Sequence, residues 1–265
     1  MTRGEGACLI CGKPIIYFEK AQKMECVMCH KKQETYASCE DGHFVCDDCH
    51  AAEGIRVIMK GCLETNSRNP IAIMQKLMEN PYIYMHGPEH HIMVGASLLA
   101  AFYNCGGFRE RGGREAYEAA LEEMEARGRE YPGGSCGFWG CCGAAVSTGM
   151  FMSIVTKATP LTGKSWGYSN MMTSRALGEI AKLGGPRCCK RNSFTAAVEA
   201  AELVKEKLGI HMELPEKIIC DFSGENMQCL KHLCPYNGMG TGRNLGQPFF
   251  NWGRSKMNFT PSPAW

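Results

Sequence analysis

The sequence predicts a mainly α-helical protein, in which a helical main domain over residues 55–265 follows a small N-terminal metal-binding module over residues 1–54. Two observations support this fold class. Segments after residue 69 carry apolar residues at helical spacing, with glycine and proline breaks between them. The first fifty residues carry closely spaced cysteine pairs and almost no apolar core, which is typical of a module that bound metal holds folded.

The composition limits the classes of function. The chain has 265 residues, 17 cysteines, 17 methionines and a net charge of +2, so its overall charge does not point to nucleic acid or to an acidic membrane surface. No signal segment is recognisable before Cys8, and the longest apolar runs, residues 92–103 and 141–155, fall short of the ~18 residues of a membrane span. We therefore expect a cytoplasmic protein from a reducing, anaerobic setting, whose thiols bind metals.

Four pairs of metal-ligand residues lie between residues 8 and 50. Three pairs are Cys-x-x-Cys knuckles and the other joins a cysteine to a nearby histidine, so together they supply two tetrahedral zinc sites, with iron as the alternative metal. The predicted ligands are Cys8, Cys11, Cys26, Cys29, Cys39, His43, Cys46 and Cys49. The pairing stays open, because a cross-brace (first pair with third, second with fourth) and a sequential grouping fit the same spacing. His30 and His50 each follow a knuckle and could replace a neighbouring ligand.

The main domain is expected to begin with a short strand over residues 55–59 and to continue as helices. Asn69 and Pro70 are typical of a helix cap and a first helical residue. Pro88 is expected to open a buried helix that ends at Gly106. The other predicted segments are an amphipathic helix over 112–130, a glycine-rich turn and core helix within 133–155, a helix over 169–183, a helix capped by Asn192 or Ser193 that ends near Gly209, and an extended tail over 237–265.

Ten cysteines lie beyond the N-terminal module, and eight of them form three sequence clusters. The clusters are Cys136, Cys141 and Cys142; Cys188 and Cys189; and Cys220, Cys229 and Cys234. Each cluster stands beside a glycine-rich turn or a helix start, a distribution that random buried thiols would not favour. Cysteine followed by proline, as at Cys234, is common at iron–sulfur ligands. These clusters predict a [4Fe–4S] cluster bound by thiols from separate segments, with inert buried cysteines as the alternative.

Two of these segments resemble a known family. The segment GGSC that ends at Cys136, followed by CGAAVSTGM from Cys142, is similar to a segment of iron–sulfur L-serine dehydratases and cysteine desulfidases. The segment from Cys188 to Asn192 resembles their Cys-x-x-Arg-Asn motif, which precedes an alanine-rich helix. The resemblance implies a [4Fe–4S] cluster with an open iron that binds substrate. A further cysteine of the family is missing here, since residues 173–187 contain none, so a cysteine of the last cluster would replace it.

The chain as a whole looks like an uncharacterised cysteine-rich family of anaerobic prokaryotes, and three functions are compatible with it. The first is an iron–sulfur lyase of the dehydratase or desulfidase type that acts on a small amino or hydroxy acid. The second is a sulfur-transfer or redox protein without lyase activity. The third is a metal- or redox-sensing protein whose zinc module contacts a protein partner.

For the lyase, His90 or His91 is the expected general base, because both lie at a helix start where the helix dipole favours a neutral imidazole. Arg191 is the expected ligand of a substrate carboxylate. The expected partners are a small-molecule substrate and, through the zinc module, a protein. Membranes and nucleic acid are not expected, since residues 1–50 carry acidic runs, and a homodimer is left open.

Overall fold

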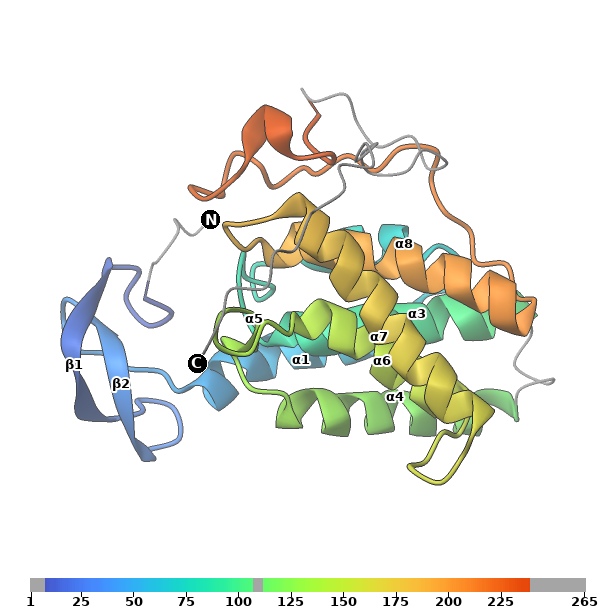
Figure 1. Cartoon of the computed structure of the whole chain (residues 1–265). Helices are drawn as coiled ribbons and strands as arrows, with labels where there is room; N and C mark the ends of the chain where they lie inside the picture. Colours follow the sequence, from blue (N-terminus) through green and yellow to red (C-terminus); the bar gives the residue numbers. More distant parts are fainter. Residues whose placement is uncertain (1–7, 107–111, 239–265) are drawn as a thin grey trace, which may run out of the picture.

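The computed structural model describes residues 8–106 and 112–238 (Figure 1). A two-stranded antiparallel sheet stands at one side, and a bundle of helices forms the rest. The prediction of a mainly α-helical chain with a small N-terminal cysteine-rich module is therefore confirmed.

The N-terminal module is built on a hairpin with little core. Strands β1 (Ile15–Glu25) and β2 (Lys32–Cys39) pair antiparallel, with an irregularity in register between Tyr17 and Gln22. Most of their side chains are exposed, and the buried cluster of this module consists of Cys26, Phe44 and Cys46. So small a cluster removes too little apolar surface from water to hold about forty residues folded by itself.

Helix α1 (Asp47–Glu64) connects the module to the bundle without a break. The strand predicted over residues 55–59 is therefore wrong. The run of β-branched residues there favours a strand locally, but Ile55, Ile58 and Cys62 recur at helical spacing and are buried against the bundle. Tertiary packing decides the structure of this segment, and the helix crosses residue 54, where the sequence suggests a boundary.

Two helices follow the sequence prediction closely. Helix α2 (Pro70–Met78) begins with proline, and the Oδ1 atom of Asn69 accepts hydrogen bonds from the N–H groups of Ile71 and Ala72 at 3.0 and 3.1 Å. Helix α3 (Glu89–Gly106) is almost entirely buried, because α1, α2, α4, α6 and α8 all pack against it.

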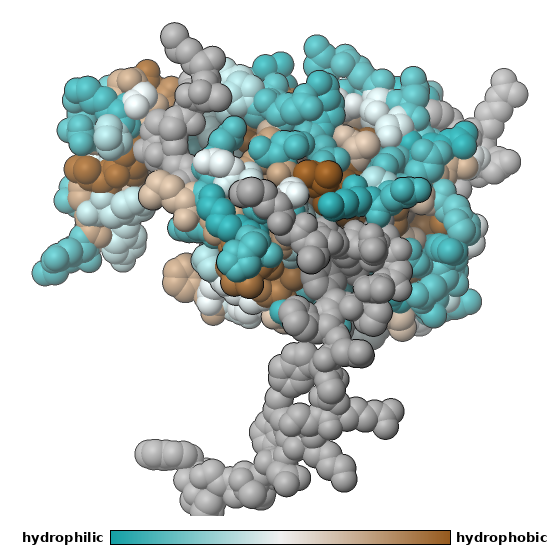
Figure 2. All heavy atoms as spheres, turned by 90° about the horizontal axis from the view of Figure 1, so that it is seen from above, coloured by the Kyte–Doolittle hydropathy of each residue, from teal (hydrophilic) through white to brown (hydrophobic). Residues whose placement is uncertain are grey.

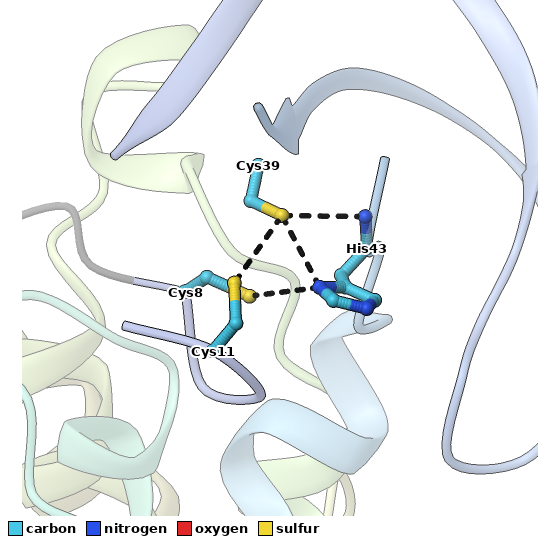
Figure 3. Close-up of side chains that lie close together, drawn as sticks. All are labelled: Cys8, Cys11, Cys39 and His43. Carbon is cyan, nitrogen blue, oxygen red and sulfur yellow. Dashed lines mark hydrogen bonds between the residues drawn. The ribbon is translucent and has the colours of Figure 1, made fainter. Parts of the chain in front are cut away.

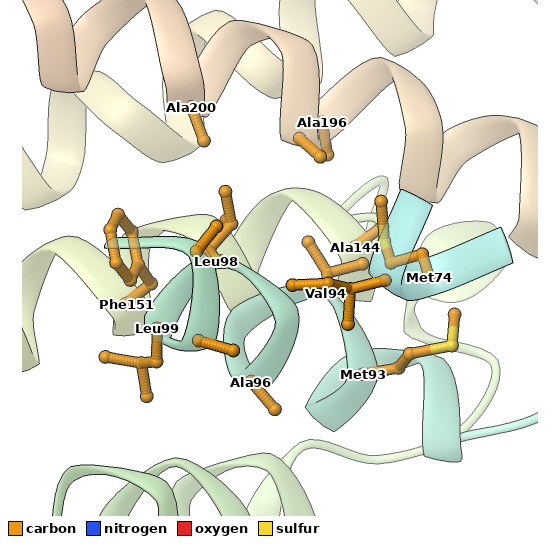
Figure 4. Packing of buried hydrophobic residues seen from close by; sticks show 14 of the residues in the cluster. Met74, Met93, Val94, Ala96, Leu98, Leu99, Ala144, Phe151, Ala196 and Ala200 are labelled. Carbon is orange, nitrogen blue, oxygen red and sulfur yellow. The ribbon is translucent and has the colours of Figure 1, made fainter. Parts of the chain in front are cut away.

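The remaining helices enclose α3. They are α4 (Gly113–Glu130), the single turn α5 (Ser135–Phe138), α6 (Gly143–Val155), α7 (Lys164–Leu183) and α8 (Cys189–Leu208). Small alanine side chains on α6 and α8 meet larger ones on α3, such as Leu98, which lets the helices approach closely (Figure 4). Helix α7 starts at Lys164, five residues before the predicted start.

The cap of α8 also differs from the prediction. Cys188 is the N-cap, and its sulfur accepts the N–H of Arg191 at 3.4 Å. Asn192 and Ser193 lie inside the helix and are buried, and the Ser193 hydroxyl donates back to the Cys189 carbonyl. Cysteine is a weak N-cap residue, so the sequence favours the stronger cap residues Asn192 and Ser193 nearby.

After α8 the chain crosses the bundle as an irregular segment with the short 3-10 helix η2 (Lys231–Leu233). The side of the molecule that carries this segment is mostly hydrophilic, with small hydrophobic groups between polar ones (Figure 2). Within the described residues no helix combines the length and the hydrophobicity needed to span a membrane. Most of the predicted tail, residues 239–265, lies outside the described residues.

Candidate metal centres

The eight predicted ligands of the N-terminal module form two groups of four. Within each group all four ligand atoms lie within 4.8 Å of one another. The first group joins Cys8, Cys11, Cys39 and His43 (Figure 3). The second group joins Cys26, Cys29, Cys46 and Cys49. The pairing is thus the cross-brace and not the sequential grouping, and either group could hold a metal ion.

In the first group, the ligand atoms face one another at short distances. The sulfur of Cys11 lies 3.8 Å from that of Cys39, and the Nδ1 atom of His43 lies 3.9 Å from the Cys8 sulfur and 3.4 Å from the Cys39 sulfur. In the second group the sulfurs of Cys29 and Cys46 lie 3.6 Å apart. Histidine therefore enters the first group through Nδ1.

Backbone N–H groups lower the pKa of one thiol in each group. The N–H of Ile10 points at the Cys8 sulfur at 3.4 Å, and the N–H of Cys46 points at the Cys26 sulfur at 3.4 Å. Burial by itself raises the pKa of Cys8, but the N–H groups around its sulfur outweigh burial and lower that pKa to about 7. The same balance lowers the pKa of Cys26 to about 6. Thiolates are the form that binds metal.

The two alternative histidines lie outside the metal-ligand groups. His30 follows a knuckle in the left-handed conformation (φ 59°), which turns its ring outward to Glu25 at 3.1 Å. Gly12, at the equivalent place after the first knuckle, has φ 77°. His50 lies in the first turn of α1 and its ring contacts that of Tyr84, with centroids 4.1 Å apart.

In the helical domain, four thiols line one small cavity between the start of α8 and the segment after it. Cys188 and Cys234 are buried, and Cys220 and Cys229 are half-buried. The space inside it that a water molecule can reach is about 20 Å³. We call it the cysteine cavity. Burial raises the pKa of Cys220 to about 11, so without a metal this thiol is protonated at neutral pH.

Polar groups around the cysteine cavity are those expected near negative charge. The Asn226 amide donates to the Cys188 sulfur at 3.5 Å, and the Lys231 N–H to the Cys229 sulfur at 3.3 Å. Lys190 is 2% exposed, and its ammonium donates to the Ile83 carbonyl at 3.4 Å and lies over the Phe222 ring. The charges of Glu89 and Glu225 act on it from further away. Among the residues that the structure describes, no carboxylate pairs with it. Burial accordingly lowers the pKa of Lys190 to about 8.

The other four predicted cluster cysteines belong to different surroundings. Cys142 is the N-cap of α6, and its sulfur accepts the Asn192 amide at 3.4 Å. Burial is the main cause of the raised pKa values of Cys142 and Cys189. The charge of Cys136 adds to the rise at Cys142, and the charge of Cys142 adds to the rise at Cys189. We call Cys136, Cys141, Cys142 and Cys189 the second thiol group. Cys188 therefore lines the cysteine cavity, whereas the adjacent Cys189 lies near Cys142.

The predicted catalytic residues are also separated. His90 is 1% exposed and its Nδ1 atom lies 3.2 Å from the Gly87 carbonyl, whereas His91 is half-buried on another face with its Nδ1 atom 3.3 Å from the Tyr131 carbonyl. Arg191 uses one guanidinium nitrogen for the carbonyls of Gly184 and Pro186, both at 2.9 Å. This contact secures the turn before α8 and leaves few donors for a substrate carboxylate.

Three buried polar residues near these centres are not predicted by sequence reasoning. Glu89 is 0% exposed and precedes His90, while Lys190 and Asn226 border the cysteine cavity. The signal that could identify Glu89 is its place inside the segment HGPEHH, where a carboxylate beside histidines often orients them. Lys190 and Asn226 carry no local signal, because their burial depends on segments distant in the sequence.

Comparison with known proteins gives one result. No curated protein and no solved structure matches the chain. Residues 58–237 match a family of unknown function, DUF5714. The match begins inside α1, so the two N-terminal ligand groups lie outside it. Because the matched range covers well over half of the chain, the protein belongs to the DUF5714 family.

Proposed function

We propose that this protein is an iron–sulfur redox protein whose N-terminal module is held folded by two zinc ions. A [4Fe–4S] cluster in the cysteine cavity would be bound by Cys188, Cys220, Cys229 and Cys234. The observation that carries the proposal is the convergence of four thiols and two buried cations on one cavity.

The ligand distances support zinc in the N-terminal module. Thiolates about 2.3 Å from a tetrahedral zinc ion stand about 3.8 Å from one another. The sulfur–sulfur distances of 3.8 Å and 3.6 Å in the two groups agree with this value. The near absence of an apolar core gives the ions a structural role, since binding energy then becomes folding energy.

Charge supports an anionic cluster in the cysteine cavity. Lys190 and Arg191 are 2% and 3% exposed, and burying a cation without an ion-pair partner is costly. The charges of Glu89 and Glu225 act on Lys190, but among the described residues neither forms an ion pair with it. Four thiols that lose their protons to a metal cluster would supply that partner. Within the described ranges only the N-terminal groups have all ligand atoms within 4.8 Å, so the cavity thiols are spread more widely than a single ion requires. A four-iron cluster, with each thiolate on a different iron, suits the wider spread.

The number of thiols favours redox chemistry over lyase chemistry. Four cysteine ligands occupy all four irons, which leaves none open to act as a Lewis acid on a substrate. Hydrogen bonds to ligand sulfurs and nearby charge set the reduction potential of such clusters, and Asn226 and Lys190 provide both here. The half-buried Cys220 and Cys229 would form the edge through which electrons pass.

The test begins with anaerobic purification, reconstitution with iron and sulfide, and analysis of iron, zinc and acid-labile sulfide. We expect four iron and four sulfide per chain in the wild type, with loss of both in Cys188→Ser and Cys234→Ser. Cys136→Ser and Cys142→Ser are the matched controls and should retain the cluster. A colourless, iron-free wild type would refute the cluster, and equal loss in the Cys136 variant would refute the ligand assignment.

Lyase activity is the second candidate, and one observation favours it. Because Cys220 and Cys229 are half-buried, release of either thiol would open one iron to a small molecule. The assay is keto-acid release from serine and cysteine by the reconstituted protein. Release that depends on the cluster would replace the redox proposal, whereas reversible one-electron reduction without release would support it.

A further inference from the structure

The second N-terminal ligand group is part of the start of α1, the helix that runs from the hairpin into the bundle (Figure 1). Cys46 is the N-cap of this helix, and Cys49 lies in its first turn. Their partners in the group, Cys26 and Cys29, come from the second knuckle. Helix ends fray easily, so an ion shared by these four residues would hold the first turn of α1 in place.

The start of α1 contacts the turn that precedes α3. The ring of His50 lies against the ring of Tyr84, with centroids 4.1 Å apart. One helical turn further on, Gly54 lets α1 approach the backbone closely, since a Cβ atom there would lie 2.6 Å from the carbonyl oxygen of Tyr82. We call residues 82–88 the linking turn. It packs against the part of α1 that the second ligand group would fix.

The linking turn also contacts the cysteine cavity. The carbonyl of Ile83 accepts a hydrogen bond from the buried Lys190 ammonium at 3.4 Å, and Met85 lines the cavity itself. Ile83 is buried in the core of the bundle. Because Ile83 and Met85 are the chain neighbours of Tyr84, a displacement of Tyr84 must move both of them.

Glu89 holds the linking turn from the start of α3. Its Oε1 atom accepts the N–H of Tyr84 at 3.1 Å, and its charge acts on both His50 and Lys190. Gly87 has no room for a side chain, because a Cβ atom there would collide with the buried Glu89 carboxylate. So closely packed a turn changes position as a unit and does not deform gradually.

We propose that the second N-terminal metal site and the cysteine cavity are coupled through the linking turn. When the ion is bound, the first turn of α1 holds Tyr84 in place, and Ile83 holds Lys190 beside the cavity thiols. When the ion is lost, the start of α1 frays, Tyr84 loses the contact with His50, and the cavity opens more often. The coupling is reciprocal, so a ligand in the cavity should tighten metal binding at the second group. Coupling to an iron–sulfur cluster rests on the function proposed above, whereas coupling to the free thiols requires only an ion in the second group.

The experiment measures how fast iodoacetamide alkylates Cys188 and Cys234, the two buried thiols of the cavity, by peptide mass spectrometry. It uses the full-length protein, loaded with zinc and free of iron. A buried thiol reacts when its surroundings open, so its rate reports the opening equilibrium. Cys29→Ser removes the second-group ion without changing α1, and it should raise both rates about 5–150-fold. Cys11→Ser is the matched control, because it removes the first-group ion and should leave both rates unchanged.

A variant that keeps both ions tests the contact itself. His50→Ala should raise both rates while it retains two zinc, so the test holds even if Cys29→Ser fails to fold. The exposed His30→Ala is its control and should change neither rate. Unchanged rates in His50→Ala, or an equal rise in Cys29→Ser and Cys11→Ser, would overturn the coupling. The cluster proposal fails separately, through an iron-free wild type after reconstitution, and these alkylation rates do not depend on it.

Discussion

Helix α1 contacts the start of α3 and the turn before it through Gly54, and this contact gives a quantitative prediction. A Cβ atom at Gly54 would lie 2.6 Å from the carbonyl oxygen of Tyr82 and 3.4 Å from the side chains of Ile83 and Glu89. The first distance is to a backbone atom, so no rotamer change can relieve it. Gly54→Ala should therefore push α1 away from the turn and lower the free energy of unfolding.

Two effects of opposite sign set the magnitude. Alanine is more favourable than glycine inside a helix by about 1 kcal/mol. Overpacking a well-packed site costs about 1–3 kcal/mol, and a clash with backbone falls in the upper part of that range. The net destabilisation is then about 1–2 kcal/mol, which corresponds to a Tm lower by roughly 2–8 °C for a chain of this size.

The assay is thermal unfolding at matched metal content, because bound metal itself raises the Tm. Gly178→Ala is the control: this residue is exposed inside α7, and a Cβ atom there has no neighbour within 4 Å. It should gain up to about 1 kcal/mol from helix propensity alone. Equal stabilisation by both substitutions would refute the close packing of α1 on the turn and, with it, the helical assignment across residue 54.

Three further predictions concern a cap, a buried thiol and a metal ligand. Asn69→Ala should cost about 1 kcal/mol in urea unfolding, because two N–H groups lose their acceptor, whereas Asn69→Asp should keep most of the stability. Burial raises the pKa of Cys62 from 9.0 to about 12, so above pH 9.0 the unfolded chain loses this proton first. The stability that the buried Cys62 thiol contributes is therefore fully present below pH 9.0 and falls by about 1.4 kcal/mol per pH unit toward pH 12. The difference in the free energy of unfolding between the wild type and Cys62→Ala should shrink accordingly between pH 8 and 11. Cys29→Ser should release one zinc from the N-terminal module, whereas loss of zinc in His30→Ala would contradict the ligand assignment.

The sequence was sufficient for features that local chemistry determines. The spacing of three knuckles and one Cys–His pair identifies the eight candidate N-terminal ligands, and the Asn69–Pro70 pair identifies the start of α2. Caps and ligand pairs involve residues within a few positions of one another. The cross-brace was not predictable in this way. Which knuckles meet depends on the β1–β2 hairpin, whose pairing brings Ile15, close after the first knuckle, opposite Cys39.

The features that sequence reasoning missed depend on distant segments. The run around Ile58 favours a strand by propensity, and only the bundle surface makes it a helix. Cys188 caps α8 because the buried interior accommodates Asn192 within the helix, where its amide reaches Cys142 of α6. The burial of Lys190 cannot be predicted from its neighbours in the sequence, because the segment after α8 lines the same cavity.

The separation of Cys188 from Cys189 follows from helix geometry. Consecutive residues at a helix start point about 100° apart, so two adjacent thiols cannot both face one small cavity. The same geometry separates His90 from His91. At one end of the bundle the start of α8 therefore directs Cys188 into the cysteine cavity and Cys189 toward the turn before α3, with the start of α6 beside it. Helix starts carry partial positive charge, but at Cys142 and Cys189 burial outweighs it and raises the pKa of both thiols. Because Cys188 lines the cysteine cavity and Cys189 does not, loss of Cys189 should leave the cluster proposed for Cys188 intact.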